Sequence, residues 1–192
     1  MSTLTDGRLF RVRKIIIPHW IQAIEAGRRA LEWQQTHDPW TTEIYIRVER
    51  SMVKLFDGNL MEITDPLIFK ANVSCRLLLN FLGLGIKARP LKLVAITNPR
   101  RETDVGIEHY SDSQGTPLPR LTTDDAIALF PDHDAACLLS SWATVIAITN
   151  KRLSHLTENS LSREQKTDAE IQATFETIPE LMQKAFLNRV AG

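Results

Sequence analysis

The sequence predicts a mainly α-helical bundle of about five or six helices with a small β-hairpin insertion. Two observations predict it: long stretches place apolar residues at every third or fourth position, and a central stretch is interrupted by proline and glycine. No internal repeat or low-complexity tract is evident. We therefore expect one helical domain over residues 1–192, with a basic N-terminal arm at 1–14 and a loop and hairpin excursion at 84–121.

Composition restricts the class of protein. Of the 192 residues, 43% are hydrophobic and 24% are charged, which is enough to bury a core and excludes disorder of the whole chain. Lys and Arg together number 23, as do Asp and Glu, so no overall positive field attracts nucleic acid, although a local basic face is compatible with neutrality. Cysteine usage predicts no disulfide framework, and no metal or cofactor is implied. Without a secretory signal or membrane span, we expect a cytoplasmic protein.

The first two predicted helices form an antiparallel pair. Pro18 suits the first turn of a helix over residues 18–36, whose apolar positions recur at helical spacing. The Asp38-Pro39 step ends that helix. A threonine cap then opens a second helix over residues 41–57, where apolar residues again recur at steps of three or four.

The third helix is predicted to begin at Pro66, because two possible capping residues precede a proline at the first helical position. Gly83 is expected to end it. In the excursion that follows, Leu91–Thr97 and Val105–Tyr110 are short apolar or β-branched segments bounded by turn residues. We expect these two segments to pair as a small hairpin.

Three more helices are expected in the last part of the chain. A short one begins at Thr122 or Thr123, a long and almost wholly apolar one is capped by Asp132, and the last runs from Ser162 to about residue 190. Pro179 is expected to kink or split the last helix. Large aromatic residues are expected to anchor the core: Trp20, Trp33, Trp40, Trp142, Phe56, Phe69, Phe81 and Phe130.

The end of the long apolar helix carries the most chemistry, with Asn-Lys-Arg-Leu-Ser-His over residues 150–155. Arg152 and His155 are three residues apart and share a helical face, while Asn150 diverges from it. A guanidinium beside an imidazole could hold an RNA phosphate and move the proton of a ribose hydroxyl. The alternative is structural, since both side chains could instead satisfy the free carbonyls of the last helical turn.

This motif, inside a helical bundle of this size, resembles the motif helix of the HEPN superfamily. Its members are helical-bundle dimers of prokaryotic toxin–antitoxin, abortive-infection and anti-phage systems, and the active ones are metal-independent RNases with an arginine a few residues before the histidine. His155 matches that histidine and Asn150 a polar residue that often follows the arginine, but Thr149 stands where the arginine would be and Arg152 is too close. The resemblance covers the chain from Asp132 onward and implies the bundle more than RNase activity.

Other basic residues are candidates for nucleic-acid contacts. Arg100 and Arg101, with His109 and Tyr110, would put cations and a polar aromatic on one projecting hairpin, and a solvated turn is the alternative. Lys151, inside the motif, is a further candidate. The basic arm could pair with phosphates or an acidic partner, or serve only as a flexible solubilising tail; its cations are Arg8, Arg11, Arg13 and Lys14.

These observations together favour a HEPN-like module that binds RNA or a protein partner in a prokaryotic defence or regulatory system, without catalytic turnover, and that forms a homodimer through the long apolar helix. One alternative is a metal-independent RNase in which His155 is the base and Arg152, or Arg76 from another helix, supplies the cation. A second is a purely structural protein-interaction domain. A third is a small-molecule pocket lined by tryptophan and the central hairpin, for which the sequence selects no ligand.

Overall fold

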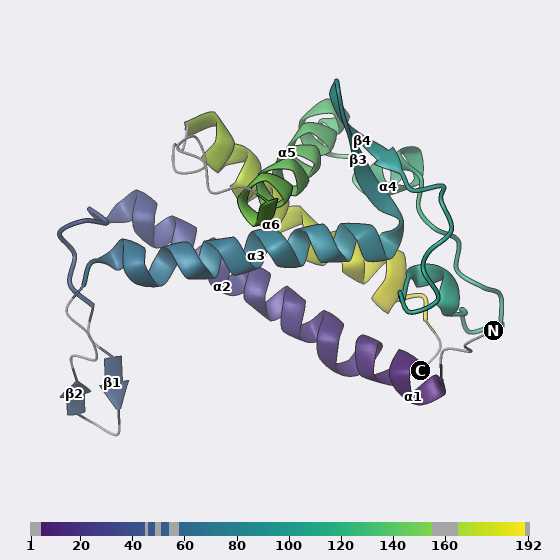
Figure 1. Cartoon of the computed structure of the whole chain (residues 1–192), viewed down its shortest axis with the longest axis horizontal. Coiled ribbons are helices and arrows are strands. Elements are labelled where there is room, and N and C mark those ends of the chain that lie inside the picture. The colour runs from purple at the N-terminus through teal and green to yellow at the C-terminus, as the bar shows by residue number, and fades with distance from the viewer. Residues whose placement is uncertain (1–4, 45, 49–50, 54–57, 155–164, 191–192) are drawn as a thin grey trace.

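The structure is a mainly α-helical bundle with a small antiparallel hairpin, as the sequence predicts, and it carries a second short strand pair (Figure 1). The computed structural model describes residues 5–44, 46–48, 51–53, 58–154 and 165–190. Along the chain, the elements are α1 (Asp6–Arg11), η1 (Val12–Ile16), α2 (Ile17–Thr36), β1 (Ile46–Val48), β2 (Ser51–Val53), α3 (Leu60–Leu82), β3 (Leu84–Ala88), β4 (Leu91–Ala95), η2 (Ile107–His109), α4 (Thr123–Ala128), α5 (Ala135–Ser154), α6 (Gln165–Met182) and η4 (Gln183–Leu187).

Helices α2 and α3 cross at close range and form the base of the bundle (Figure 1). The contact is made at Gly27 of α2, where an added Cβ would overlap the side chain of Ala71 on α3 and lie 3.4 Å from the ring of Phe175 on α6. Because glycine lets the two backbones approach, Ile24 and Leu31 on the same face of α2 are both buried. The close crossing therefore depends on the absence of a side chain at one position.

The helix predicted over residues 41–57 is wrong, because the described part of this segment contains strands β1 and β2. The two strands pair antiparallel, with Ile46 opposite Val53. Ile44, Ile46 and Val48 alternate along the chain, and β-branched residues favour an extended backbone. A short apolar run fits a helical or a strand period almost equally well, and here the strand period prevails.

Helix α3 begins at Leu60, well before the predicted start at Pro66. Its cap is Asn59, whose side chain accepts a hydrogen bond from a backbone N–H of the first turn (3.3 Å). Thr64, expected to be a cap, is buried inside the helix and donates its hydroxyl to Leu60 O (2.8 Å). Burial of this first part outweighs the backbone hydrogen bond that Pro66 cannot make. Gly83 ends the helix as predicted, in the left-handed conformation with φ of 98°.

The hairpin of the excursion differs from the predicted one in its partner. Strand β4 lies within the predicted 91–97 segment, but it pairs with β3, so that Leu84 faces Ala95. The other predicted strand, 105–110, contains the 3₁₀ turn η2 instead. Strands β3 and β4 are joined by a turn of two residues, whereas β4 could reach residues 105–110 only by closing a longer loop. The shorter connection costs less chain entropy, which explains why β4 pairs with β3.

Helices α4 and α5 occur where they are predicted, with one cap displaced. Thr122 and Asp125 form a capping box at α4, in which the Thr122 hydroxyl accepts the Asp125 N–H (3.1 Å) and the Asp125 carboxylate accepts the Thr122 N–H (3.0 Å). The predicted cap of α5 at Asp132 is wrong. Asp134, one residue before the helix, accepts the N–H of Cys137 instead (2.7 Å).

Helix α5 supplies the core, as predicted, and packs against α6, α3 and the β3–β4 hairpin. Its Trp142 is fully buried and donates its indole N–H to the hydroxyl of Thr177 on α6 (2.9 Å). Helix α6 continues through Pro179 without being split, and the π-helix η4 follows it. The predicted start of this last helix at Ser162 lies outside the described residues.

Two of the expected core tryptophans are on the surface. Trp33 is 50% exposed and Trp40 is 67% exposed, so their assignment to the core is wrong. Trp33 belongs to the last turn of α2, and Trp40 follows four residues beyond the end of that helix. Trp142, Phe81 and Phe130 are buried, Trp20 and Phe69 are partly buried, and Phe56 lies outside the described residues. Within the described chain, no helix is both long and apolar enough to cross a lipid bilayer.

The α2–α3 crossing predicts a large effect of a single methyl group. Gly27→Ala is expected to lower the free energy of unfolding by roughly 1–3 kcal/mol, because the added Cβ must push Ala71 and α3 away. Gly7→Ala in α1 is the matched control, since nothing lies within 4 Å of a Cβ there and alanine favours a helix. Urea denaturation of both variants measures the difference. Equal stabilities of the two variants would contradict the close crossing.

Candidate functional site

Three polar residues follow one face of the second half of α3. Asn72, Arg76 and Asn80 are four residues apart, which places them above one another on consecutive turns. Asn72 is 1% exposed, and neither its amide nitrogen nor its amide oxygen has a hydrogen-bond partner. Arg76 and Asn80 are half-buried. An unsatisfied buried amide is costly, so this polar face needs an explanation other than core packing.

Arg76 and Asn80 line a pocket of about 430 Å³ between α3, the β3–β4 hairpin and the end of α5. We call it the Arg76 pocket. Asn150 enters it from α5, and Asn98 from the segment after β4. Its volume is in the range of sites for small ligands. The described residues that line it are Arg76, Asn80, Gly85, Ile86, Val94, Ala95, Ile96, Thr97, Asn98, Ile146 and Asn150.

The polar groups of this pocket are uncommitted. Within the described chain, the guanidinium of Arg76 makes no hydrogen bond or ion pair, and the same holds for the side-chain amides of Asn80, Asn98 and Asn150. Among the described residues that line the pocket, Arg76 is the one that is charged, and none is acidic. The pocket therefore offers a cation and several amides that can each donate and accept hydrogen bonds, which suits an anionic, polar ligand.

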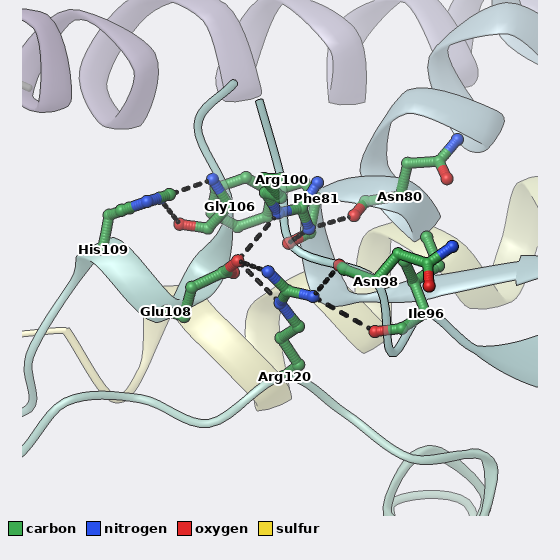
Figure 2. Close-up of polar contacts among 9 residues, drawn as sticks. All are labelled: Asn80, Phe81, Ile96, Asn98, Arg100, Gly106, Glu108, His109 and Arg120. Carbon is green, nitrogen blue, oxygen red and sulfur yellow. Dashed lines mark hydrogen bonds and ion pairs between the residues drawn. The ribbon is translucent and has the colours of Figure 1, made fainter. Parts of the chain in front are cut away.

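The pocket wall is held by two arginines that share one carboxylate, shown in Figure 2. The same carboxylate oxygen of Glu108, Oε1, accepts hydrogen bonds from both Arg100 (2.9 Å) and Arg120 (2.6 Å). We call this cluster the Arg100–Glu108–Arg120 bridge. Arg120 also donates to Ile96 O (3.2 Å) and Asn98 O (2.8 Å), which fixes the segment that carries Asn98.

Arg100 fixes the other wall of the pocket. Its guanidinium donates to the backbone oxygens of Asn80 and Phe81 (3.0 Å to the latter) in the last turn of α3 (Figure 2). The Asn80 oxygen also accepts the N–H of Gly83 (3.1 Å). A Cβ at Gly106 would overlap both Arg100 and Glu108, so the loop can pass the bridge only because residue 106 is glycine. Local sequence gives no sign of this cluster, because its members are far apart in the chain.

Of the residues predicted to catalyse, Asn150 lies in the Arg76 pocket. Arg152 belongs to α5, but its side chain is outside the described residues, as is the whole of His155. The structure thus brings Asn150 together with Arg76, the alternative source of the cation. Asn72, Asn80 and Asn98 were missed, although the four-residue spacing of Asn72, Arg76 and Asn80 was a signal that could have shown the polar face of α3.

The residues predicted to bind nucleic acid do not gather at one place. Arg100 is part of the bridge and half-buried, whereas Arg101 and Lys151 are exposed. His109 does not project, because its Nδ1 accepts the N–H of Gly106 (2.9 Å) within the turn η2. The neighbouring Tyr110 is buried and donates its hydroxyl to Leu9 O in α1 (2.9 Å). The basic arm is helical from Asp6 onward and is fixed to the excursion by this bond and by Arg8, which donates to Thr103 O.

Comparison of the chain with protein-family models, with curated proteins and with solved structures gives no match. Among the described residues, no three His, Cys, Asp or Glu side chains converge in a way that would hold a metal ion. The geometry and charge of the Arg76 pocket are therefore the features that indicate a function.

The bridge predicts a specific acid sensitivity. Burial would raise the pKa of Glu108, but its own backbone N–H, Arg120 and Arg100 together outweigh burial and hold the pKa below the ordinary 4.5. The ionised carboxylate therefore stabilises the folded chain above the unfolded-state pKa, and this stability is lost as the pH falls through the lowered folded-state pKa. We expect Glu108→Gln to reduce the loss of stability between about pH 7 and about pH 3.

The measurement is urea denaturation at both pH values. Glu102→Gln is the control, because Glu102 is exposed in the same loop and pairs with no residue of the described chain. The pKa of Glu25 is lowered as well, to about 2, chiefly by Arg28. Glu25 therefore also loses its stabilising charge in acid, so part of the acid sensitivity remains in the Glu108→Gln variant. An unchanged difference between the two pH values in Glu108→Gln would contradict the argument.

Asn72 gives a second prediction for this site. Asn72→Leu keeps the number and branching of the side-chain heavy atoms and removes two unsatisfied polar groups, so the free energy of unfolding should rise by roughly 1–3 kcal/mol. Asn80→Leu is the control, since Asn80 is half-buried and lines an open pocket. Thermal denaturation compares the two, and a destabilised Asn72→Leu would show that Asn72 is satisfied in solution.

Proposed function

We propose that the chain is an RNA-binding helical module, and that the Arg76 pocket holds a phosphate and an adjoining nucleotide of a single strand. One observation supports this above all: among the described residues, an unpaired guanidinium lies with three uncommitted asparagine side chains in a pocket that no described acidic residue lines. Guanidinium groups bind phosphate in a two-pronged geometry. Asparagine amides match the donor and acceptor pairs on base edges. The resemblance of residues 150–155 to the HEPN motif points to the same ligand class.

A single strand fits the site better than a duplex does. The pocket has the volume of a small-ligand site and is walled by a hairpin and two helices, so one unstacked nucleotide can enter it while a helix of paired bases cannot. The chain is neutral overall, so long-range attraction contributes little and affinity depends on local contacts. Binding through one arginine should have a shallow salt dependence.

We propose that the chain binds RNA without cleaving it. Cleavage of RNA needs a group that transfers a proton beside the phosphate, and among the described residues that line the pocket there is no histidine, cysteine or carboxylate. The alternative is a metal-independent RNase in which His155, beyond the described end of α5, serves as the base. The cytoplasmic location and the defence or regulatory context rest on the resemblance alone and stay predictions.

The homodimer also stays a prediction. It was expected because an apolar helix must be covered, but α5 packs its apolar residues against α6, α3 and the hairpin of the same chain. A second candidate function, a protein-interaction domain, is favoured by Trp33 and Trp40, two exposed indoles at and just beyond the end of α2. Failure of the wild-type chain to bind RNA would favour that candidate.

The test is fluorescence anisotropy with a labelled single-stranded RNA of mixed sequence in the presence of a metal chelator. Arg76→Ala should weaken binding by at least about tenfold, because it removes a charge-assisted contact to phosphate, and Arg76→Lys should restore part of the loss. Arg189→Ala is the matched control, since Arg189 is exposed, carries the same charge and does not line the pocket.

Each outcome of that experiment decides something. Equal losses in Arg76→Ala and Arg189→Ala would exclude the Arg76 pocket as the site. Loss of RNA binding in Arg101→Ala, with Arg76→Ala unaffected, would move the site to the exposed loop. Gel analysis of the same samples should show intact RNA; metal-free cleavage that His155→Ala abolishes would replace the binding module with the RNase.

A further inference from the structure

A second and larger pocket, of about 580 Å³, lies between the N-terminal helices, the end of α3 and the loop that follows Arg100. We call it the Arg11 pocket. It shares Asn80 with the Arg76 pocket and is otherwise lined by different residues. The Arg100–Glu108–Arg120 bridge positions its floor as well, since Arg100 lines it and binds the last carbonyls of α3. The RNA proposal does not account for this pocket.

The wall of the Arg11 pocket contains a π-helical turn. Residues Val12–Ile16 form η1, in which the N–H of Ile17 reaches back to Val12 O. Pro18, which follows at once, has no N–H to donate and crowds the preceding turn, so the wider turn relieves a conflict that a regular helix would meet. Val12 and Ile16, at the two ends of this turn, both line the pocket. Such turns are rare, and they occur frequently at functional sites.

The rim of the pocket is cationic, and one of its cations is uncommitted. Arg8 donates to Thr103 O and Arg100 belongs to the bridge, so both guanidiniums have internal partners. Arg11 is exposed and, within the described chain, makes no hydrogen bond or ion pair. Among the described residues that line the same pocket, Asp104 is the one that is acidic, so the described lining has a positive balance. The rim therefore favours an anionic group.

The body of the pocket is apolar and aromatic. Trp20 is only partly buried and lines the pocket together with aliphatic residues from η1 and α3. Phe81 also lines it, but its ring packs edge to face against Tyr110 and Phe186 in the core. Tryptophan offers a flat face on which a planar ring can stack. A ligand that satisfies both halves of the pocket must join a planar aromatic ring to an anion.

We propose that the Arg11 pocket binds a nucleoside 5′-phosphate, with its base against Trp20 and its phosphate at Arg11. The same chemistry is presented by a free mononucleotide and by the phosphorylated 5′ end of an RNA, so both are sources of the ligand. The inference goes beyond the RNA proposal, because it rests on a different pocket and on different cations.

The test is isothermal titration calorimetry of the full chain with adenosine 5′-monophosphate and its guanosine, cytidine and uridine counterparts. We expect saturable binding, a loss of at least about tenfold in Arg11→Ala, and weaker binding of adenosine and of ribose 5-phosphate, each of which has only one half of the ligand. Lys14→Ala is the matched control, because Lys14 is an exposed cation on the same helical arm that does not line the pocket.

The role of the indole is tested by Trp20→Phe and Trp20→Leu. Phenylalanine should retain most of the affinity and leucine should lose it, with circular dichroism confirming that both variants fold. Competition between 5′-phosphorylated and 5′-hydroxyl RNAs of one sequence distinguishes an RNA end from the free nucleotide, since only the former source predicts a preference for the phosphorylated strand.

The failure of this proposal is distinguishable from the failure of the RNA proposal. Arg76→Ala should leave mononucleotide binding unchanged, and Arg11→Ala should leave the binding of 5′-hydroxyl RNA unchanged. The absence of mononucleotide binding to the wild-type chain, or an equal loss in Arg11→Ala and Lys14→Ala, would overturn the assignment of the Arg11 pocket.

Discussion

The arrangement of both pockets depends on a single carboxylate. Glu108 accepts hydrogen bonds from Arg100 and Arg120, and these two arginines in turn bind four backbone oxygens at the end of α3 and after β4. A long excursion is thereby fixed to the bundle at the point where the two pockets meet. Two guanidiniums this close repel each other, and the shared carboxylate is what allows both to stay in place. The nearby Gly106 leaves the space for them.

Cations in this neutral chain fall into two groups. Arg100 and Arg120 hold the chain together, whereas Arg11 and Arg76 have no partner within the described chain and line pockets. A paired guanidinium has most of its donors occupied, so it offers little to an incoming phosphate. Net charge therefore says little about ligand binding here, because what matters is which cations the fold leaves unpaired.

Two departures from regular packing occur in helices that line these pockets. The polar face of α3 includes the unsatisfied Asn72 in its buried part, and the π-turn before Pro18 lines the Arg11 pocket. Elsewhere the bundle is packed conventionally, with Gly27 at a close helix crossing and Trp142 satisfied by Thr177. Costly local features that gather around cavities in a fold of this kind are typical of sites kept for function rather than stability.

Caps, turns and apolar spacing in the sequence determined the helical class, the end of α3 at Gly83, the box at Thr122 and the buried place of Trp142. These signals act over a few neighbouring residues, so one chain suffices to show them. Only the tertiary structure decided that β4 pairs with β3 and that Arg100 is an internal cation. The groups that bind Arg100, namely Glu108 and the backbone oxygens of α3, are 8 to 20 residues away from it in the chain. Such pairings depend on which distant segments the fold brings together, and no local pattern records them.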